Sequence, residues 1–211
     1  MHDKRSRIFE AAEAMFAEHG FDGTTTQQIS DRADIAAGTL FRYAASKGEL
    51  LLMVYNEKFR AALEDGAAVA RGRTNTTDAV FGMAEALLRG ADPRSDNTIA
   101  YQRELLFGSP TDKYRSEGLA LVERLESMIA ERLVADARRD GRAAESSDEI
   151  ASRRWEEQAA LAGRSIFAVL HLAFAQPATG AHSGHDAPAD LRAQIAQIIA
   201  GFNTSIGRQE Q

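Results

Sequence analysis

Thr39, Arg42 and Tyr43 lie within five consecutive positions and carry the groups with which proteins bind nucleic acids. An arginine guanidinium can donate two hydrogen bonds to O6 and N7 of guanine, which discriminates this base by about 1–3 kcal/mol. The methyl groups of Thr39 and of the nearby Ala37 can contact the methyl group of thymine. These side chains can read base edges if an exposed helix carries them.

The segment that must position these side chains is Thr24 to Leu50, which has the pattern of two short helices and the start of a third. Thr25 and Gln28 have the spacing of a capping box, which predicts that the first short helix begins here. The second short helix is predicted over residues 37–43, and Ser46-Lys47-Gly48-Glu49 forms a second capping box that opens a long helix. Two short helices joined by a tight turn form a helix-turn-helix, whose second helix enters the major groove of DNA.

The first fifty or so residues resemble the DNA-binding domain of the TetR family of bacterial transcriptional regulators. The matching residues are Ile8-Phe9-Glu10-Ala11-Ala12, Phe16, Gly20-Phe21, Thr25-Thr26, Ile29, Ala33, Gly38-Thr39-Leu40-Phe41-Arg42-Tyr43 and Ser46-Lys47-Gly48-Glu49-Leu50, about a quarter of the chain. The resemblance implies that the residues at Thr26, Gln27, Tyr43 and Lys47 contact bases or phosphates. The complete set of candidate DNA-binding residues is Thr25, Thr26, Gln27, Ala37, Gly38, Thr39, Arg42, Tyr43 and Lys47.

Four residues of this segment differ from the family pattern. Asp34 stands where the family has a turn glycine, so either Asp34 adopts a left-handed conformation, which Asp tolerates, or the turn differs. Ala36 replaces the usual Ser or Thr cap of the second helix. Phe41 replaces a tyrosine whose hydroxyl commonly contacts phosphate, and Ala44 replaces a bulky aromatic residue. We expect these changes to preserve the fold and to affect the affinity for DNA.

The charge is unusual for a protein that binds nucleic acid by bulk electrostatics. The net charge of the chain is −6, and residues 1–50 contain six basic and eight acidic side chains. Binding would therefore depend on a few placed contacts and on dimerisation. Lys4, Arg5 and Arg7 could reach phosphates or could simply be solvated. Residues 1–50, called the head below, are thus acidic, which motivates an alternative function. In this alternative the chain is a helical small-molecule-binding or interaction module that has lost specific operator binding.

Composition limits the remaining possibilities. The 211 residues include no cysteine, which excludes disulfides and thiolate metal sites and is compatible with a cytoplasmic location. The most apolar run, residues 159–175, is interrupted by Arg164 and His171, so no membrane span is expected. His182, His185 and Asp186 have only a loosely metal-like spacing, and no metal or cofactor is predicted.

Apolar periodicity predicts helices along the rest of the chain. After a first helix that Gly20 closes, helices are predicted over Ser46–Asp65, Asp78–Arg89, Asn97–Gly108, Thr111–Arg139, Asp148–Ala175 and from Pro188 onward. Gly66–Thr77 is predicted to be a loop or a frayed helix end, and Gln176–Ala187 a loop. The predicted fold is all-α, with an N-terminal three-helix helix-turn-helix domain over residues 1–47. A helical-bundle regulatory and dimerisation domain is predicted over residues 48–211.

The last two predicted helices are the candidate dimer interface. The helix that ends at Ala175 is apolar nearly all round in its second half, which predicts full burial. Pairing both helices across a two-fold axis would give a four-helix bundle and resembles the dimer of the family. The predicted interface residues are Ile166, Leu170, Phe174, Ile195, Ile199 and Phe202.

A small-molecule site is predicted mainly from the resemblance. Its candidate residues are Met83, Leu87, Tyr101, Leu105, Phe107, Leu121, Leu125, Trp155, Phe167 and His171, each of which could instead be plain core. No catalytic arrangement stands out, and an all-α enzyme that uses a carboxylate in the cavity is the second alternative. The sequence therefore predicts a homodimeric repressor that binds a palindromic double-stranded DNA operator and is released by a small, largely apolar effector.

Overall fold

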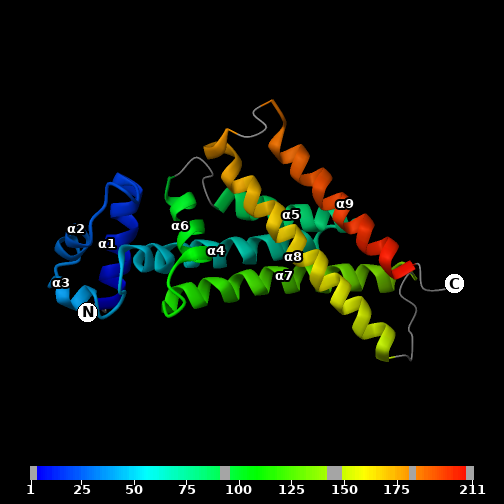
Figure 1. Cartoon of the computed structure of the whole chain (residues 1–211), viewed down its shortest axis with the longest axis horizontal. Helices are drawn as coiled ribbons and strands as arrows, with labels where there is room; N and C mark the ends of the chain where they lie inside the picture. The colour runs from blue at the N-terminus through cyan, green and yellow to red at the C-terminus, as the bar shows by residue number, and fades with distance from the viewer. Residues whose placement is uncertain (1–3, 91–95, 142–148, 181–183, 208–211) are drawn as a thin grey trace. The chain divides into compact units, whose positions relative to one another are not determined.

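The computed structural model describes residues 4–90, 96–141, 149–180 and 184–207, and over these residues the chain is helical without a strand (Figure 1). In chain order the helices are α1 (Lys4–His19), α2 (Thr26–Arg32), α3 (Ala37–Leu40), α4 (Lys47–Arg71), α5 (Thr76–Gly90), α6 (Asp96–Phe107), α7 (Lys113–Arg139), α8 (Glu149–Thr179) and α9 (Ala187–Gly207). The predicted all-α fold, with a helix-turn-helix at its N-terminus and a helical regulatory part, is confirmed.

The helices form two compact units. One comprises Met1–Ala61 and Gly90–Leu121, and the other comprises Ala62–Arg89 and Val122–Gln211, so the division falls inside α4 and inside α7. The predicted domain boundary between residues 47 and 48 stays a prediction.

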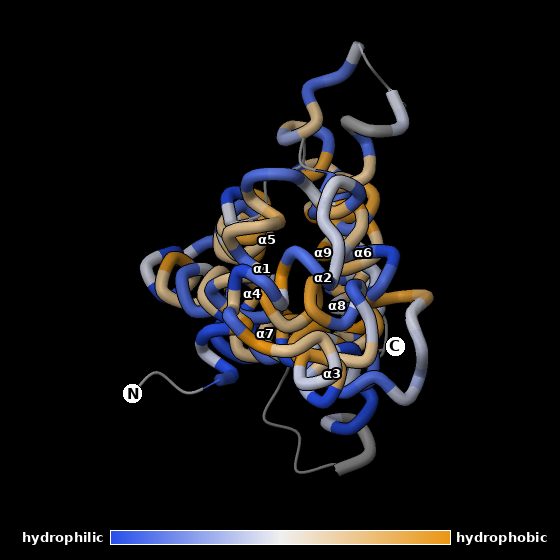
Figure 2. The backbone as a smooth tube through the Cα atoms, turned by 90° about the vertical axis from the view of Figure 1, so that its left-hand side faces the viewer, coloured by the Kyte–Doolittle hydropathy of each residue, from blue (hydrophilic) through white to orange (hydrophobic). Residues whose placement is uncertain are grey.

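The core of the first unit follows from the amphipathic pattern of its helices. Ile8 and Phe16 of α1, Ile29 of α2, Leu40 of α3 and Leu50 of α4 are all buried. Hydrophobic and hydrophilic stretches alternate along the helices in Figure 2, as one-sided burial requires. The three N-terminal helices and the start of α4 therefore share one small core.

Several helix ends lie where local sequence signals place them. Gly20 follows α1 with a φ of 69°, and Thr25 and Gln28 form the predicted capping box at the start of α2. The amide of Glu49 donates to the hydroxyl of Ser46 at 3.0 Å, so Ser46 caps α4 as predicted. These ends depend only on residues three or four positions apart.

The second helix of the motif is shorter than predicted. The sequence predicts it over residues 37–43, but α3 ends at Leu40 and residues 41–43 continue as a turn. The amides of Arg42 and Tyr43 donate to carbonyls three residues back, at 3.2 and 2.9 Å, which is the tighter bonding common at helix ends. Arg42 and Tyr43 therefore lie on the turn that ends α3.

Both predicted loops prove partly helical. Helix α4 continues beyond Asp65 to Arg71, and α8 continues beyond Ala175 to Thr179. A Cβ atom at Gly66 would lie 3.1 Å from the Cα of Met83, so this glycine permits close helix packing and does not end α4. Residues 181–183 of the second predicted loop lie outside the described residues.

Helix α6 and the start of α7 belong to the first unit together with the helix-turn-helix. The side-chain amide of Asn97 donates to the carbonyl of Phe16 at 2.8 Å. The buried carboxylate of Glu49 accepts from the amides of Ala45, at 2.6 Å, and Lys113, at 3.0 Å. One carboxylate thus joins the start of α4 to the start of α7.

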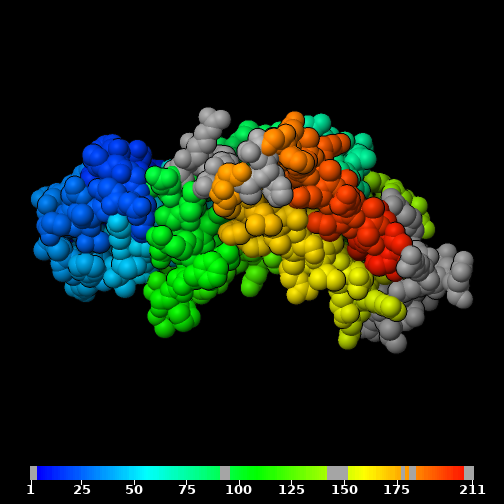
Figure 3. Space-filling view, turned by 45° about the horizontal axis from the view of Figure 1, so that its top comes forward, coloured from blue at the N-terminus to red at the C-terminus, as the bar shows by residue number. Residues whose placement is uncertain are grey.

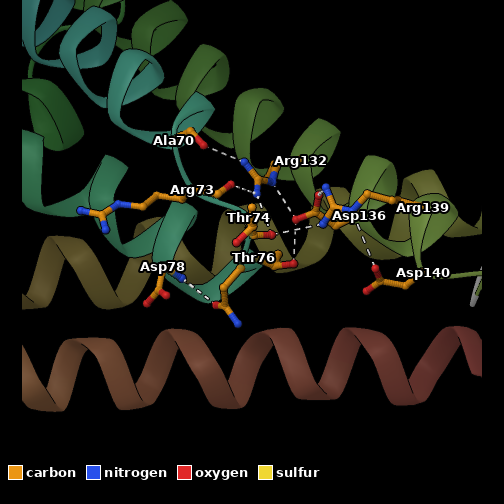
Figure 4. A network of polar contacts seen from close by, with 10 residues as sticks. Ala70, Arg73, Thr74, Thr76, Asp78, Arg132, Asp136, Arg139 and Asp140 are labelled. Carbon is orange, nitrogen blue, oxygen red and sulfur yellow. Dashed lines mark hydrogen bonds and ion pairs between the residues drawn. The ribbon is translucent and has the colours of Figure 1, made fainter.

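A charged network organises the second unit (Figure 4). Asp136 of α7 is 2% exposed and accepts from Arg132 at 2.6 Å and from the hydroxyl of Thr76 at 2.7 Å. Arg132 also donates to the carbonyl of Ala70 at 2.8 Å, and Arg139 pairs with Asp136 at 2.9 Å. The network fastens the end of α4 and the start of α5 to α7.

In the single chain the apolar half of α8 is not fully buried, and its full burial by a second copy stays a prediction. Leu161 is 51% exposed and Leu172 is 67% exposed, although Ile166 and Leu170 on the same helix are buried. Helix α9 covers one side of α8, and the side that carries Leu161 and Leu172 faces solvent in the single chain. Periodicity indicates that a helix is apolar on more than one side, but it does not say what covers each side.

Candidate nucleic-acid interface

The turn between α2 and α3 has a left-handed residue at Asp34, whose φ is 49°. The amide of Asp34 donates to the carbonyl of Asp31 at 3.1 Å, and that of Ile35 donates to the carbonyl of Ser30 at 3.0 Å. This pair of bonds is the Schellman motif that commonly ends a helix with glycine. The sequence left open whether Asp34 is left-handed or the turn differs. The structure has the first, because Asp34 adopts the left-handed conformation of the glycine it replaces.

Arg7 of α1 reaches this turn from across the sequence. Its Nε donates to the carbonyl of Ala33 at 2.9 Å, and its terminal nitrogen donates to the carbonyls of Ala33 and Asp34. The same nitrogen lies 3.1 Å from the Asp34 carboxylate. From the sequence, Arg7 could contact a phosphate or be solvated. In the structure it instead bonds Ala33 and Asp34 inside the helix-turn-helix.

The outer surface of α3 and its following turn carries the predicted base-reading side chains. Gly38 and Arg42 are exposed, while Ala37, Thr39 and Tyr43 are half-buried. A Cβ atom at Gly38 would meet nothing within 4 Å, so this part of the surface is open. The guanidinium of Arg42 has no ion pair among the described residues and is available to a ligand.

The predicted contacts on α2 already make local hydrogen bonds. The hydroxyl of Thr25 accepts from the amide of Gln28 at 3.2 Å, as an N-cap. The side-chain amide of Gln27 donates to the Asp31 carboxylate at 2.7 Å, and both side chains remain exposed. Thr26 is half-buried at the first position of the helix. The predicted contact of the start of α2 with DNA stays a prediction.

Lys47 lies partly inside the motif. Its Nζ donates to the carbonyls of Phe21 at 2.7 Å and Thr24 at 2.9 Å, and it stands 4.2 Å from the centroid of the Phe21 ring. The ammonium therefore fastens the segment between α1 and α2 to the start of α4. Two of its three donors are used in this way, and the predicted contact of Lys47 with DNA stays a prediction.

Arg32 is the third basic side chain of the head with an internal partner. It donates to Glu18 at 2.7 Å, and this hydrogen bond holds the pKa of the Glu18 carboxyl below its ordinary value. With Arg7 and Lys47 also engaged, the basic side chains of residues 4–50 without an ion pair among the described residues are Lys4, Arg5 and Arg42. These residues are the best candidates for contacts with phosphates or bases.

The candidate effector residues divide between the two units. Tyr101, Leu105, Phe107 and Leu121 belong to the first unit, and Met83, Leu87, Leu125, Trp155, Phe167 and His171 belong to the second. Most are buried, but Phe107 is 82% exposed at the end of α6, so it lines no buried site here. The buried Nε1 of Trp155 has no hydrogen-bond partner among the described residues, and desolvation lowers the pKa of the half-buried His171.

A buried polar cluster of the first unit escaped the sequence analysis. The hydroxyl of Tyr101 donates to the side-chain oxygen of Asn56 at 2.9 Å, and Asn56 donates to the carbonyl of Tyr114 at 2.8 Å. Burial raises the pKa of the Tyr101 phenol well above its ordinary value. The available signal was Asn56 itself, a polar residue that follows the buried run Leu50–Val54 on α4.

The candidate interface residues of α8 and α9 pack mainly inside the chain. Ile166, Leu170, Ile195, Ile199 and Phe202 are buried, and Phe174 is half-buried. The two helices lie side by side in Figures 1 and 3. Two cavities lie along their seam, one of about 170 Å³ beside Leu161 and one of about 210 Å³ beside Leu172.

The described residues bear on two further possibilities, a metal site and a membrane-spanning helix. No group of three metal-ligating side chains occurs among the described residues, where Asp186 caps α9 and His185 pairs with Asp190. His182 lies outside them. Residues 152–176 of α8 are long and apolar enough to cross a membrane by length and composition alone. A core helix of a soluble protein meets the same two criteria, so they do not establish a membrane span.

Known proteins resemble the N-terminal segment in sequence. The family model for bacterial regulatory proteins of the tetR family matches residues 8–54. The transcriptional repressor KstR of Mycolicibacterium smegmatis is 36% identical over 72 residues, which are 33% of this chain and 35% of the relative. KstR2 of Mycobacterium tuberculosis is 41% identical over 51 residues, 24% of this chain and 26% of the relative. The chain thus matches about a third or less of these curated relatives.

Solved structures resemble the whole chain in fold. FadR of Thermus thermophilus, a TetR-family repressor in complex with lauroyl-CoA, aligns with a TM-score of 0.70 and 23% identity over 93% of this chain and 94% of that one. FadR of Bacillus subtilis in complex with stearoyl-CoA aligns with a TM-score of 0.61 and 19% identity over 93% of this chain and 98% of that one. At these identities the likeness concerns the fold alone.

Proposed function

We propose that the chain is a member of the tetR family of bacterial regulatory proteins, a cytoplasmic repressor that binds a (pseudo)palindromic operator as a homodimer and releases it when a small, largely apolar effector binds. The observation that carries the proposal is the open surface of α3, with Gly38 unobstructed and the guanidinium of Arg42 available. An enzymatic role has no support, since the family and the curated relatives are transcriptional regulators.

Operator reading rests on the exposed end of α3. The absence of a side chain at Gly38 lets the backbone approach the floor of a groove, and Arg42 can donate two parallel bonds to guanine. In-vitro selection from a random duplex library should recover two inverted half-sites with centres about 34–36 Å apart, the repeat expected for a helix-turn-helix dimer. Recovery of no common sequence would refute operator reading.

The homodimer is proposed to form through the exposed side of α8 together with α9. Leu161 and Leu172 are eleven residues apart, about three helical turns, so they lie on the same side of α8. Small side chains such as Ala162 and Ala173 line the adjoining cavities, which can receive the side chains of a second copy. Of the residues predicted as the interface, those that are buried would then pack beneath this surface and would not contact the second copy directly.

The dimer surface can be tested with a matched control. Arg in place of both Leu161 and Leu172 should give a monomer in sedimentation-velocity experiments and should weaken operator binding, because the two heads are then no longer linked. Phe107→Arg changes an even more exposed apolar side chain outside α8 and α9, and should leave the dimer intact. A dimer that persists in the double variant would place the interface elsewhere.

The effector proposal is supported by chemistry inside the second unit. The unpartnered Nε1 of Trp155 is a donor that a polar group of a ligand or a water molecule would satisfy. The FadR proteins were solved with long-chain acyl thioesters, so such compounds are reasonable first candidates. A true effector should release operator DNA in fluorescence anisotropy and quench or shift Trp155 emission. If a compound releases the operator but binds Trp155→Phe as tightly as the native protein, Trp155 is not part of the effector site.

The alternative is a helical binding or interaction module without specific operator binding. The excess of acidic over basic residues in the head favours it, as does the internal use of Arg7, Arg32 and Lys47. Such a module would bind every duplex weakly and with equal affinity, which the selection experiment would reveal.

A further inference from the structure

We propose that Arg7 positions the recognition helix: its guanidinium holds the carbonyls of the α2–α3 turn, so operator binding depends on an arginine that does not contact DNA. The inference rests on the proposed function for its DNA-binding readout. A second readout in the DNA-free protein tests the positioning role independently.

Helix α2 ends with carbonyl groups that need donors. The Schellman bonds use the carbonyls of Ser30 and Asp31, but the carbonyls of Ala33 and Asp34 lie beyond them. Arg7 donates to both, with Nε on Ala33 and a terminal nitrogen bridging Ala33 and Asp34. The guanidinium is rigid and planar, so bonds to two adjacent carbonyls also fix the orientation of the peptide between them.

Charge explains why a cation is needed at this place. The C-terminal end of a helix carries partial negative charge, and the carboxylate of Asp34 adds a full negative charge beside it. Asp34 also holds a left-handed conformation that is less favourable for it than for glycine. The guanidinium of Arg7 offsets both effects, because it lies 3.1 Å from the carboxylate and bonds the helix-end carbonyl.

The recognition helix depends on this turn because little else fixes its start. Helix α3 is four residues long, and its N-cap Ala36 makes no side-chain capping bond. Leu40 anchors α3 to the core from one side, but a single buried side chain does not fix rotation about its own axis. The turn from Ala33 to Ala36 must therefore set how α3 presents Arg42.

The geometry also argues against the alternative role of Arg7 as a phosphate contact. Its side chain is only 33% exposed, and both Nε and a terminal nitrogen donate to backbone carbonyls. Arg5 provides the contrast, since it precedes Arg7 on the same helix, is exposed and has no ion pair among the described residues. The two arginines should therefore affect DNA binding in different ways.

The DNA experiment compares Arg7→Ala with Arg5→Ala on the selected operator over a series of salt concentrations. Arg7→Ala should weaken binding about tenfold or more while leaving the slope of log K against log salt unchanged. Arg5→Ala should reduce the magnitude of the slope by about 0.9 for each phosphate that Arg5 neutralises. Arg7→Lys, which keeps the charge but not the planar fork, should behave like Arg7→Ala.

Hydrogen exchange of the full-length, DNA-free protein supplies the second readout. The amides of Ile35 and Thr39 should exchange faster in Arg7→Ala and at the native rate in Arg5→Ala, with the amides of α4 unchanged in both as a control for folding. Asp34→Gly should keep native exchange and affinity, because it retains the backbone acceptors and removes only the strain and the exposed carboxylate.

A lower salt slope in Arg7→Ala with native exchange at the turn would overturn the proposal and make Arg7 a phosphate contact. If no duplex is bound specifically, the proposed function fails, but faster exchange at Ile35 would still establish that Arg7 holds the turn. Native exchange in Arg7→Ala would exclude the positioning role whatever the DNA results.

Discussion

The salt dependence of operator binding should be modest, because the head uses half of its basic side chains internally. Arg7, Arg32 and Lys47 have partners within the head, and Lys4, Arg5 and Arg42 remain available. Arg42 is assigned to guanine, so in the proposed dimer Lys4 and Arg5 of the two heads make four phosphate contacts, and log K should fall with log salt with a slope of about −4, at roughly −0.9 per phosphate contact. Affinity should then weaken about 150-fold between roughly 50 and 200 mM salt.

The assay is fluorescence anisotropy of the selected operator at five or more concentrations of monovalent salt. If all basic residues of both heads contacted phosphates, the slope would approach about −11. Such a slope would refute the internal assignments of Arg7, Arg32 and Lys47. A slope near zero would contradict phosphate binding by Lys4 and Arg5. Arg32→Ala serves as the control, since removal of a side chain engaged with Glu18 should leave the slope unchanged.

Further variants test the structural account. Asp136→Ala leaves Arg132 without its partner, and because breaking a buried pair costs about 3–5 kcal/mol, Tm should fall by roughly 6–20 °C in calorimetry; an unchanged Tm would show that the network of Figure 4 contributes nothing. Gly163→Ala should also lower Tm, because the added Cβ would lie 2.7 Å from the backbone oxygen of Glu126 on α7; a native Tm would contradict that close approach. Burial lowers the pKa of His171 below its ordinary value of 6.5, so the unfolded chain binds the proton more readily. The stability linked to His171 should be present above pH 6.5 and be lost as pH falls through the folded-state pKa, and His171→Gln should flatten the denaturant-unfolding profile over that range; an identical profile in the variant would refute this assignment.

Features that depend on neighbouring residues could be predicted from the sequence. The capping box of Thr25 and Gln28, the Ser46 cap and the left-handed Gly20 each depend on positions at most four residues apart. The amphipathic pattern of α1 likewise predicts its buried face. The helix-turn-helix is therefore recognisable residue by residue from the sequence.

Features that depend on tertiary contacts could not be predicted. Arg7 and Lys47 are candidates for DNA contacts by sequence, but each bonds carbonyls 26 residues away along the chain, and no local pattern encodes that contact. The low helix propensity of glycine predicts a helix end at Gly66, whereas in the structure this residue permits the close approach of Met83. A helix-breaking glycine and a packing glycine look alike in sequence.

The apolar pattern of α8 was informative but ambiguous. It correctly predicted the burial of Ile166 and Leu170, yet it gave the same prediction for Leu161 and Leu172, which are exposed. A helix apolar on several sides needs several partners, and the sequence of one chain does not say whether a second copy provides one of them. The exposed leucines therefore became visible as candidates for assembly only in the structure.

The measurement that tests the central claim most directly is the specificity of DNA binding and its dependence on Arg42. Anisotropy should be measured for the native protein and Arg42→Ala on the selected operator and on a scrambled duplex of the same composition. We predict that the native protein prefers the operator by about a thousandfold or more, and that Arg42→Ala loses most of this preference while binding the scrambled duplex only slightly more weakly. Equal binding to both duplexes, indifferent to Arg42, would contradict the regulator and leave a helical binding module on the same fold.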